Sequence, residues 1–245
     1  THPRITSNTF SFTANTIKAD TCDYNFKSPS TSGYAFIAEN TRTEINFDLK
    51  ETRFHLNTDN SLVKFPEIQY ICTMTDFLYN QDTRILSMEQ KGKAETELLT
   101  PDKLLKADLR NLDKPTFFAT NVIGDTIAFS SWKASYNVDQ EYIAAENINY
   151  LHIADALIQP DQGKLTINRR AKINQLQNAI VAINNKHLLH SARIDIESTK
   201  KYSGSGVYDY IDENKETQQI NIAEITVDSL MTSAIGYVPV SQNFR

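Results

Sequence analysis

The sequence lacks the features that mark several large classes of protein. No run of about 18 or more apolar residues occurs, so no transmembrane helix is expected. Two cysteines are too few for the disulfide framework of a small secreted domain. The 25 Lys and Arg residues are interspersed with 30 Asp and Glu residues, and the net charge is -5, so nucleic acid is not an expected partner.

The usual catalytic signatures are also missing. The chain has no Gly-x-Ser-x-Gly nucleophile elbow, no Walker loop and no local Cys and His signature. We therefore expect a chain that is not an enzyme and needs no cofactor. No catalytic, cofactor-binding or metal-binding residue is predicted.

The dominant pattern that is present is alternation of polar and apolar residues with period two. It occurs at residues 53–56, 164–167, 193–196 and 219–222, and turn-forming residues separate such runs at short intervals. With 40% hydrophobic and 22% charged residues, the chain should fold as a soluble globular protein. The pattern predicts an all-β fold: an open β-roll, a β-solenoid or a sandwich-like stack of short strands.

One segment near the middle predicts a short helix, at residues 100–111. Thr100 is a suitable N-cap, Pro101 suits the first helical position, and Leu104, Leu105 and Leu109 would share one face. Residues 169–179 fit either a second helix or a strand, a turn and another strand. Residues 159–164, with Pro160 and Gly163, predict a hairpin-like turn.

The two sides of this helix look like distant copies of one unit. Residues 34–40 match residues 142–147, and alternating strands follow in both. The alternative is chance matching of short apolar words. The expected organisation is a β-rich repeat unit at 1–99, a helical or loop connector at 100–116 and a second β-rich unit at 117–245, all cut from a longer protein.

Three local features have a functional and a structural interpretation. Cys22 and Cys72 are compatible with one disulfide or with two buried thiols. His187 and His190 have metal-ligand spacing but no third ligand nearby, which favours a loop or strand surface. Residues 202–208 contain Gly-x-Gly without the third glycine and helix of a dinucleotide site, which favours a glycine-rich bend or bulge between strands.

Carboxylates supply the main alternative to a binding role. Paired acids across a sugar would serve a polysaccharide-acting hydrolase or lyase on a β-helix, although such acids more often stabilise turns. The residues to check are Asp20, Asp23, Asp155, Asp209 and Asp212.

Short sequence words carry a family resemblance. Ala38-Glu39-Asn40 and Ala145-Glu146-Asn147, followed by residues 153–156 and 160–163, resemble large, uncharacterised β-repeat proteins of Gram-negative envelopes. The strand rhythm is also similar to the periplasmic β-roll (jelly-roll) bridge proteins of lipopolysaccharide transport, in which an open roll carries acyl chains in an apolar interior. The resemblance covers residues 10–229 and carries over no catalytic residue. The helix at 100–111 and the stretch at 202–208 depart from it.

The resemblance implies an extracytoplasmic protein, periplasmic or associated with the outer membrane. We expect a non-catalytic structural or binding module of a cell-envelope protein that handles lipid or glycolipid in an apolar groove. Its expected partners are other envelope proteins, or further repeats of the same chain. Unpaired edge strands also favour self-association.

Overall fold

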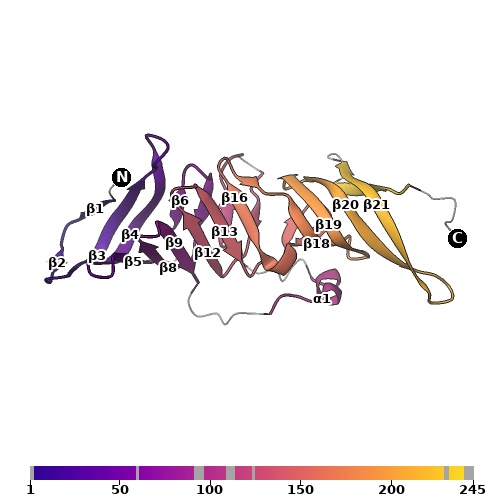
Figure 1. Ribbon diagram of the computed structural model, residues 1–245, viewed down its shortest axis with the longest axis horizontal. Coiled ribbons are helices and arrows are strands. Elements are labelled where there is room, and N and C mark those ends of the chain that lie inside the picture. The colour runs from indigo at the N-terminus through magenta and orange to yellow at the C-terminus, as the bar shows by residue number, and fades with distance from the viewer. Residues whose placement is uncertain are drawn as a thin grey trace.

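The computed structural model describes residues 3–58, 61–90, 97–108, 114–122, 125–228 and 232–239. Two curled antiparallel sheets follow one another along an elongated molecule, with β2 and β3 near one end of the long axis and β20 and β21 near the other (Figure 1). In the described part of the chain, strands dominate and one short α-helix is present. The predicted all-β fold is therefore confirmed.

The first sheet has 15 strands. They are β1 (Arg4–Ser7), β2 (Ser11–Phe12), β3 (Thr16–Lys27), β4 (Tyr34–Asn46), β5 (Glu51–Leu56), β6 (Val63–Phe65), β7 (Tyr70–Cys72), β8 (Asp76–Asn80), β9 (Ile85–Glu89), β10 (Phe117–Ala119), β11 (Ala128–Phe129), β12 (Lys133–Asn137), β13 (Tyr142–Glu146), β16 (Leu165–Asn168) and β17 (Lys172–Ile173). The second sheet has seven strands. They are β14 (Leu151–Ile153), β15 (Ala156–Gln159), β18 (Leu176–Ile183), β19 (His187–Ser198), β20 (Lys201–Ile211), β21 (Thr217–Asp228) and β22 (Ser233–Tyr237).

The first sheet folds over on itself at β4. The first half of β4 pairs with β6 at Ile37 and Ala38, and its second half pairs with β5. Between the two halves, Asn40 has a φ of 54°, a left-handed conformation that asparagine tolerates and that bends a strand. One arm of the sheet is β6, β7, β10 and β11, and the other runs from β5 to β17.

Aromatic side chains fill the space between the two arms. Phe65 on one arm lies 5.1 Å from Tyr136 on the other, measured between ring centroids, and Phe36 on β4 contacts both rings. Eight aromatic side chains of this interior are at most 3% exposed: Tyr24, Phe26, Phe36, Phe54, Phe65, Phe77, Tyr79 and Tyr136. The apolar face predicted from the alternation is therefore a packed core.

Hairpin turns at one end of the strands of the first sheet are linked to each other by charged side chains. Asn80 and Asn137 each accept two backbone N–H groups in their own turns. Arg84, at the end of the first turn, pairs with Asp139 in the second turn, with 2.6 Å between Nε and Oδ1. Lys50 makes the equivalent pair with Asp82, at 3.0 Å. These pairs link successive turns, while backbone hydrogen bonds set the spacing of the strands between them.

Helix α1 (Pro101–Leu105) begins where the sequence predicts and ends earlier. Thr100 is at the N-cap position but makes no side-chain capping bond, and at Lys106 the backbone leaves the helical region, with a ψ of 7°. Leu104 is buried against Leu157 and Ala182 of the second sheet. The expected continuation through Leu109 lies in residues 109–113, outside the described residues.

Two other local predictions have clear outcomes. Residues 159–164 do form a turn, with Gly163 at a φ of 64°, but it is not a hairpin. It contains η2 (Asp161–Gly163) and connects β15 of the second sheet to β16 of the first, because the two strands have different pairing partners. Residues 169–179 form β17, a turn and the start of β18, so the strand alternative is confirmed.

The predicted repeat units stay a prediction. Residues 34–40 lie in β4, and residues 142–146 form β13. Strands from both sides of the expected connector share the first sheet, since β9 pairs with β12 over five residues.

The two cysteines are free thiols, and both are buried. Cys22 donates a hydrogen bond to Oγ1 of Thr43 at 3.1 Å, and the sulfur of Cys72 accepts one from the backbone of Met74 at 3.4 Å. Burial raises the pKa of Cys72 to about 12. This thiol therefore stays protonated and unreactive in the folded protein.

Because several tyrosines are buried, we expect the protein to lose stability at alkaline pH. Burial raises the pKa of Tyr70 and of Tyr136 above the ordinary value, and neither hydroxyl has a hydrogen-bond partner among the described residues. The folded protein therefore resists ionisation that the unfolded chain undergoes near pH 10. We expect the free energy of unfolding to begin falling above about pH 8, where Cys72 ionises only in the unfolded chain, and to fall more steeply above about pH 10, where the tyrosines do so. Denaturant titrations at several pH values test this, and a flat profile would contradict it.

Candidate functional site

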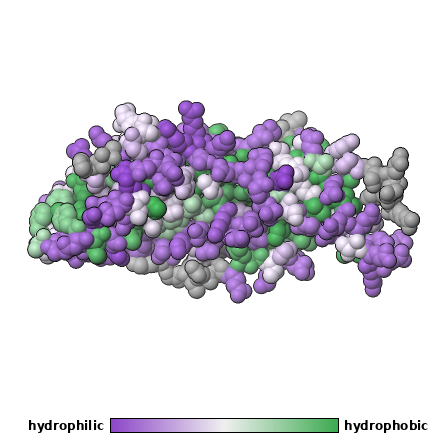
Figure 2. Space-filling view, viewed as in Figure 1, coloured by the Kyte–Doolittle hydropathy of each residue, from purple (hydrophilic) through white to green (hydrophobic). Residues whose placement is uncertain are grey.

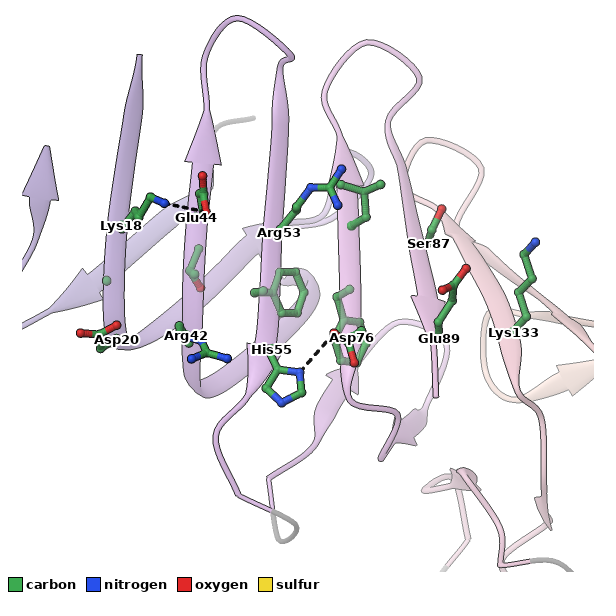
Figure 3. Close-up of a pocket in the computed structure, with 15 residues that line it drawn as sticks. Lys18, Asp20, Arg42, Glu44, Arg53, His55, Asp76, Ser87, Glu89 and Lys133 are labelled. Carbon is green, nitrogen blue, oxygen red and sulfur yellow. Dashed lines mark ion pairs between the residues drawn. The ribbon is translucent and has the colours of Figure 1, made fainter. Parts of the chain in front are cut away.

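A wide hollow lies over the face of the first sheet that carries the charged side chains. It has a volume of about 700 Å³, within the usual range for small-molecule sites. Figure 3 shows its charged side chains projecting from β3, β4, β5, β8, β9 and β12. The lining residues are Lys18, Ala19, Asp20, Arg42, Thr43, Glu44, Arg53, Phe54, His55, Asp76, Phe77, Leu78, Ser87, Glu89 and Lys133.

Strand register places the polar residues of the hollow in rows. One row crosses the strands at directly paired positions: Arg42, His55, Asp76, Glu89 and Lys133. Directly paired residues of antiparallel strands point to the same face, with Cβ atoms about 5 Å apart. The row spans five strands, so it is roughly 20 Å long.

Aromatic packing behind this row holds it in place. Phe54 alternates with Arg53 and His55 along β5 and points into the core, where its ring stacks on Phe77 of β8. The two ring centroids are 4.7 Å apart, and the rings are nearly parallel. Since the supporting strands cannot move without opening this core, the polar row is preorganised for a ligand.

Some charges of the hollow are neutralised within the protein. Lys18 pairs with Glu44 at 3.1 Å, and Nδ1 of His55 lies 3.2 Å from Oδ1 of Asp76 (Figure 3). Arg53 pairs at 3.1 Å with Glu51, at the edge of the same face. These pairs are partly exposed, so each contributes little to stability.

Four charged side chains of the hollow remain available to a ligand. Asp20, Arg42, Glu89 and Lys133 make no ion pair or side-chain hydrogen bond with the other described residues. Two are basic and two are acidic. A ligand with both hydrogen-bond donors and acceptors would suit this set better than a polyanion or an acyl chain.

Asp76 and Glu89 are the closest approach to a carboxylate pair in the hollow. They are directly opposite each other on β8 and β9, an arrangement that is unfavourable for two like charges. His55 beside Asp76 and Lys133 opposite Glu89 offset this repulsion. No group of three His, Cys, Asp or Glu side chains in the described part of the chain is placed to hold a metal ion.

The acids suggested by the sequence do not converge. Asp20 lines the hollow, while Asp23 accepts the backbone N–H of Asn40 at 3.0 Å. Asp155 accepts hydrogen bonds from Tyr202, Asn184 and the backbone of Ala234. Asp209 and Asp212 belong to the distant hairpin of β20 and β21, where Asp212 accepts backbone N–H groups of the turn. Most of these acids therefore have structural partners.

The histidine pair lies on β19, far along the second sheet. The ring of His187 packs edge-on against Tyr208, with 5.6 Å between centroids. Nε2 of His190 lies 3.3 Å from Oδ1 of Asp209. Both rings are thus on a strand surface, one of the interpretations that the sequence leaves open.

Sequence reasoning missed Arg42, His55, Asp76, Glu89 and Lys133. The alternation assigns each of them to the solvent face of its strand, and that signal is present in the sequence. It does not say which strands are neighbours. The row therefore emerges only from the pairing of β4, β5, β8, β9 and β12.

Comparison with known proteins gives a single result. No family model, no curated protein and no solved structure matches this chain. The resemblance to envelope β-repeat proteins and to the lipopolysaccharide-transport bridges therefore stays a prediction. In the part of the chain that the structure describes, no helix is long and apolar enough to cross a membrane.

Proposed function

We propose that this chain is a non-catalytic binding module that holds a saccharide, free or as the head of a glycolipid, in the hollow of the first sheet. The observation that carries the proposal is the row of charged side chains on a rigid sheet, in which Arg42, Glu89 and Lys133 are left without partners, as is Asp20 elsewhere in the hollow. Saccharides present hydroxyl groups that donate and accept hydrogen bonds. Charged side chains of both signs satisfy both roles, and such bonds are stronger than neutral ones.

The polar lining supports the saccharide part of a glycolipid over its acyl part. An acyl chain needs an apolar groove, and the apolar side chains between the two arms are almost fully buried against one another. The hollow is lined instead by charged residues, with Leu78 as the only aliphatic side chain that projects with them in its lining. A ligand of roughly 20 Å could lie across the strands along the charged row.

A location in the cell envelope, in the periplasm or at the outer membrane, belongs to this proposal. It rests on the resemblance of the sequence words and on the strand rhythm, and envelope polysaccharides would supply the ligand. Other envelope proteins, or further repeats of the same chain, are the proposed protein partners.

Binding to soluble polysaccharide tests the proposed site. The probes are lipopolysaccharide, its lipid-free polysaccharide and neutral dextran, each titrated into the full chain by calorimetry. Arg42→Gln and Lys133→Gln should each weaken saccharide binding about tenfold, because each removes one charge-assisted hydrogen bond. Both residues are exposed and unpaired in the described structure, so the fold should be unaffected.

Arg193→Gln is the matched control for this titration. Arg193 is an equally exposed arginine, on β19 of the second sheet. It should leave the affinity unchanged. Equal effects of all three substitutions, or no binding of any probe to the unmodified chain, would overturn the proposed site.

A polysaccharide-acting enzyme is the second candidate, favoured by the facing carboxylates of Asp76 and Glu89. Directly paired side chains are close to the carboxyl spacing of about 5 Å in retaining glycosidases. Glu89→Gln separates the two functions. An enzyme would lose turnover of the polysaccharide while keeping affinity, whereas a binding module releases no product with either protein.

Self-association through edge strands is a further prediction for the isolated chain. β22 closes one end of the second sheet, and Ile235 and Tyr237 on it are 61% and 66% exposed. Uncharged edge strands of this kind pair readily with other strands. We expect light scattering after size-exclusion chromatography to show dimers or larger species that Ile235→Lys converts to monomer. A monomer at every concentration would contradict this.

A further inference from the structure

The end of the molecule that carries β2 exposes a compact group of apolar side chains. Phe10, Phe12, Phe47 and Leu49 are 38%, 69%, 53% and 59% exposed. We call these four residues the apolar tip. Figure 2 shows hydrophobic surface at this end of the molecule, at the left of the view, where Figure 1 places β2.

Two neighbouring loops build the apolar tip and are tied together. The backbone N–H of Phe47 donates to the carbonyl of Asn15 at 3.0 Å, and the amide of Asn15 also donates to the carboxylate of Asp48. Within the first loop, the rings of Phe10 and Phe12 are 6.2 Å apart. The four side chains are therefore held at one end by the protein's own structure.

Few charged groups lie close to the apolar tip. The chain from Ile5 to Ile17 has no charged residue. In the second loop, Lys50 pairs with Asp82, and Asp48 accepts a hydrogen bond from the neutral amide of Asn15 and keeps its charge. Because a carboxylate is costly to transfer to an apolar medium, the four apolar side chains would enter the bilayer while Asp48 stays among the polar headgroups.

The size and shape of the apolar tip favour a lipid surface over a protein partner. Aromatic side chains present roughly 150 to 250 Å² each, so the exposed fractions sum to about 400 Å². A stable protein interface needs about 800 Å² from each partner. Loops at the end of a long molecule can enter a bilayer without a complementary surface, and phenylalanine and leucine suit its interfacial and acyl regions.

We propose that the apolar tip inserts into the surface of a lipid bilayer and anchors the molecule there by its N-terminal end. The anchor is independent of the saccharide hollow. Because the two loops present no unpaired basic group to anionic lipid, binding should be insensitive to salt and should not require anionic lipid. The long axis of the molecule would then extend away from the membrane.

Flotation with phosphatidylcholine vesicles tests the proposal on the full chain. The unmodified protein should float with the vesicles at low and at high salt. Phe12→Ser combined with Phe47→Ser should lower the partition coefficient at least about a hundredfold, since each substitution removes about 100 Å² of exposed apolar surface. Both residues are exposed, so the variant should unfold at the same denaturant concentration as the unmodified protein.

Two controls make the test specific. Tyr210→Ser combined with Ile211→Ser removes a similar apolar area from β20 at the opposite end of the molecule, where these residues are 45% and 64% exposed, and should leave flotation unchanged. Arg42→Gln alters only the saccharide hollow and should also float, so failure of the hollow and failure of the anchor are distinguishable. The proposal is overturned if the unmodified protein does not float, or if the tip variant floats equally well. It is also overturned if the only effect of the tip substitutions is to convert a dimer to a monomer, because the apolar tip would then be an interface between two copies of the chain.

Discussion

Replacing Phe36 by alanine should reduce the free energy of unfolding by about 3 to 5 kcal/mol, one of the two largest effects we expect in this chain. Phe36 is completely buried on β4, the strand at which the first sheet folds over. Its ring lies 5.4 Å from Phe26 and 5.7 Å from Tyr24, and four further aromatic rings are within 6.4 Å. Removing it would leave a cavity between the two arms that rings on both sides cannot close.

Equilibrium unfolding in denaturant measures this effect, and Phe12→Ala is the matched control. Phe12 is 69% exposed, so its truncation should change stability by less than about 1 kcal/mol. A loss below about 1 kcal/mol for Phe36→Ala would mean that the interior between the two arms is loosely packed. An acyl chain between the arms would then become the leading candidate for the ligand, and the argument that favours a saccharide over an acyl chain would be lost.

The two faces of each strand follow directly from the sequence. Along residues 53–56, the alternation places Arg53 and His55 in solvent and Phe54 and Leu56 in the core, as the structure has them. Local chemistry is sufficient here, because side-chain direction in a strand changes with every residue. The start of helix α1 at Pro101 was also predictable, because it too depends on local chemistry.

The folding of the sheet at β4 was not predictable, although the sequence contains a trace of it. The matching words that end in Asn40 and Asn147 both place this asparagine in the left-handed conformation, with φ values of 54° and 57°. In both places the chain then changes its pairing partners. After Asn40 the partner changes from β6 to β5, and after Asn147 the chain leaves β12 and β16 of the first sheet and forms β14, which pairs with β15 of the second. This short sequence therefore specifies a local bend of the backbone. Which strands pair after the bend depends on the residues that follow.

The hollow shows why a site built across strands resists prediction. Glu89 and Lys133 are adjacent in space because β9 pairs with β12, yet the helix and two strands of the other arm separate them in the chain. Alternation gives the face of each residue but not its neighbour on the next strand. The same limit explains the turn at residues 159–164, where Pro160 and Gly163 fix the local geometry but not which sheet the next strand joins.

The glycine-rich stretch at residues 202–208 lies inside one long strand, β20, rather than between two strands. Its predicted bulge is present, since the register with β21 shifts between Gly204 and Gly206. Gly204 also faces the backbone of β19 at very close range. A methyl group at this position would lie 1.9 Å from the carbonyl oxygen of Arg193. No side-chain rotation can relieve this overlap, because both partners belong to the backbone.

Gly204→Ala is therefore expected to destabilise the protein by about 3 kcal/mol or more, since β19 and β20 must separate to admit one methyl group. Gly236→Ala on the edge strand β22 is the matched control. There the nearest atom to the new methyl is Cγ2 of Ile222, at 3.2 Å, which belongs to a half-buried side chain with room to move. We expect a change below about 1 kcal/mol for this control. Similar unfolding midpoints for the two variants would show that the backbones of β19 and β20 do not approach each other as closely as described. The curvature of the second sheet would then need revision.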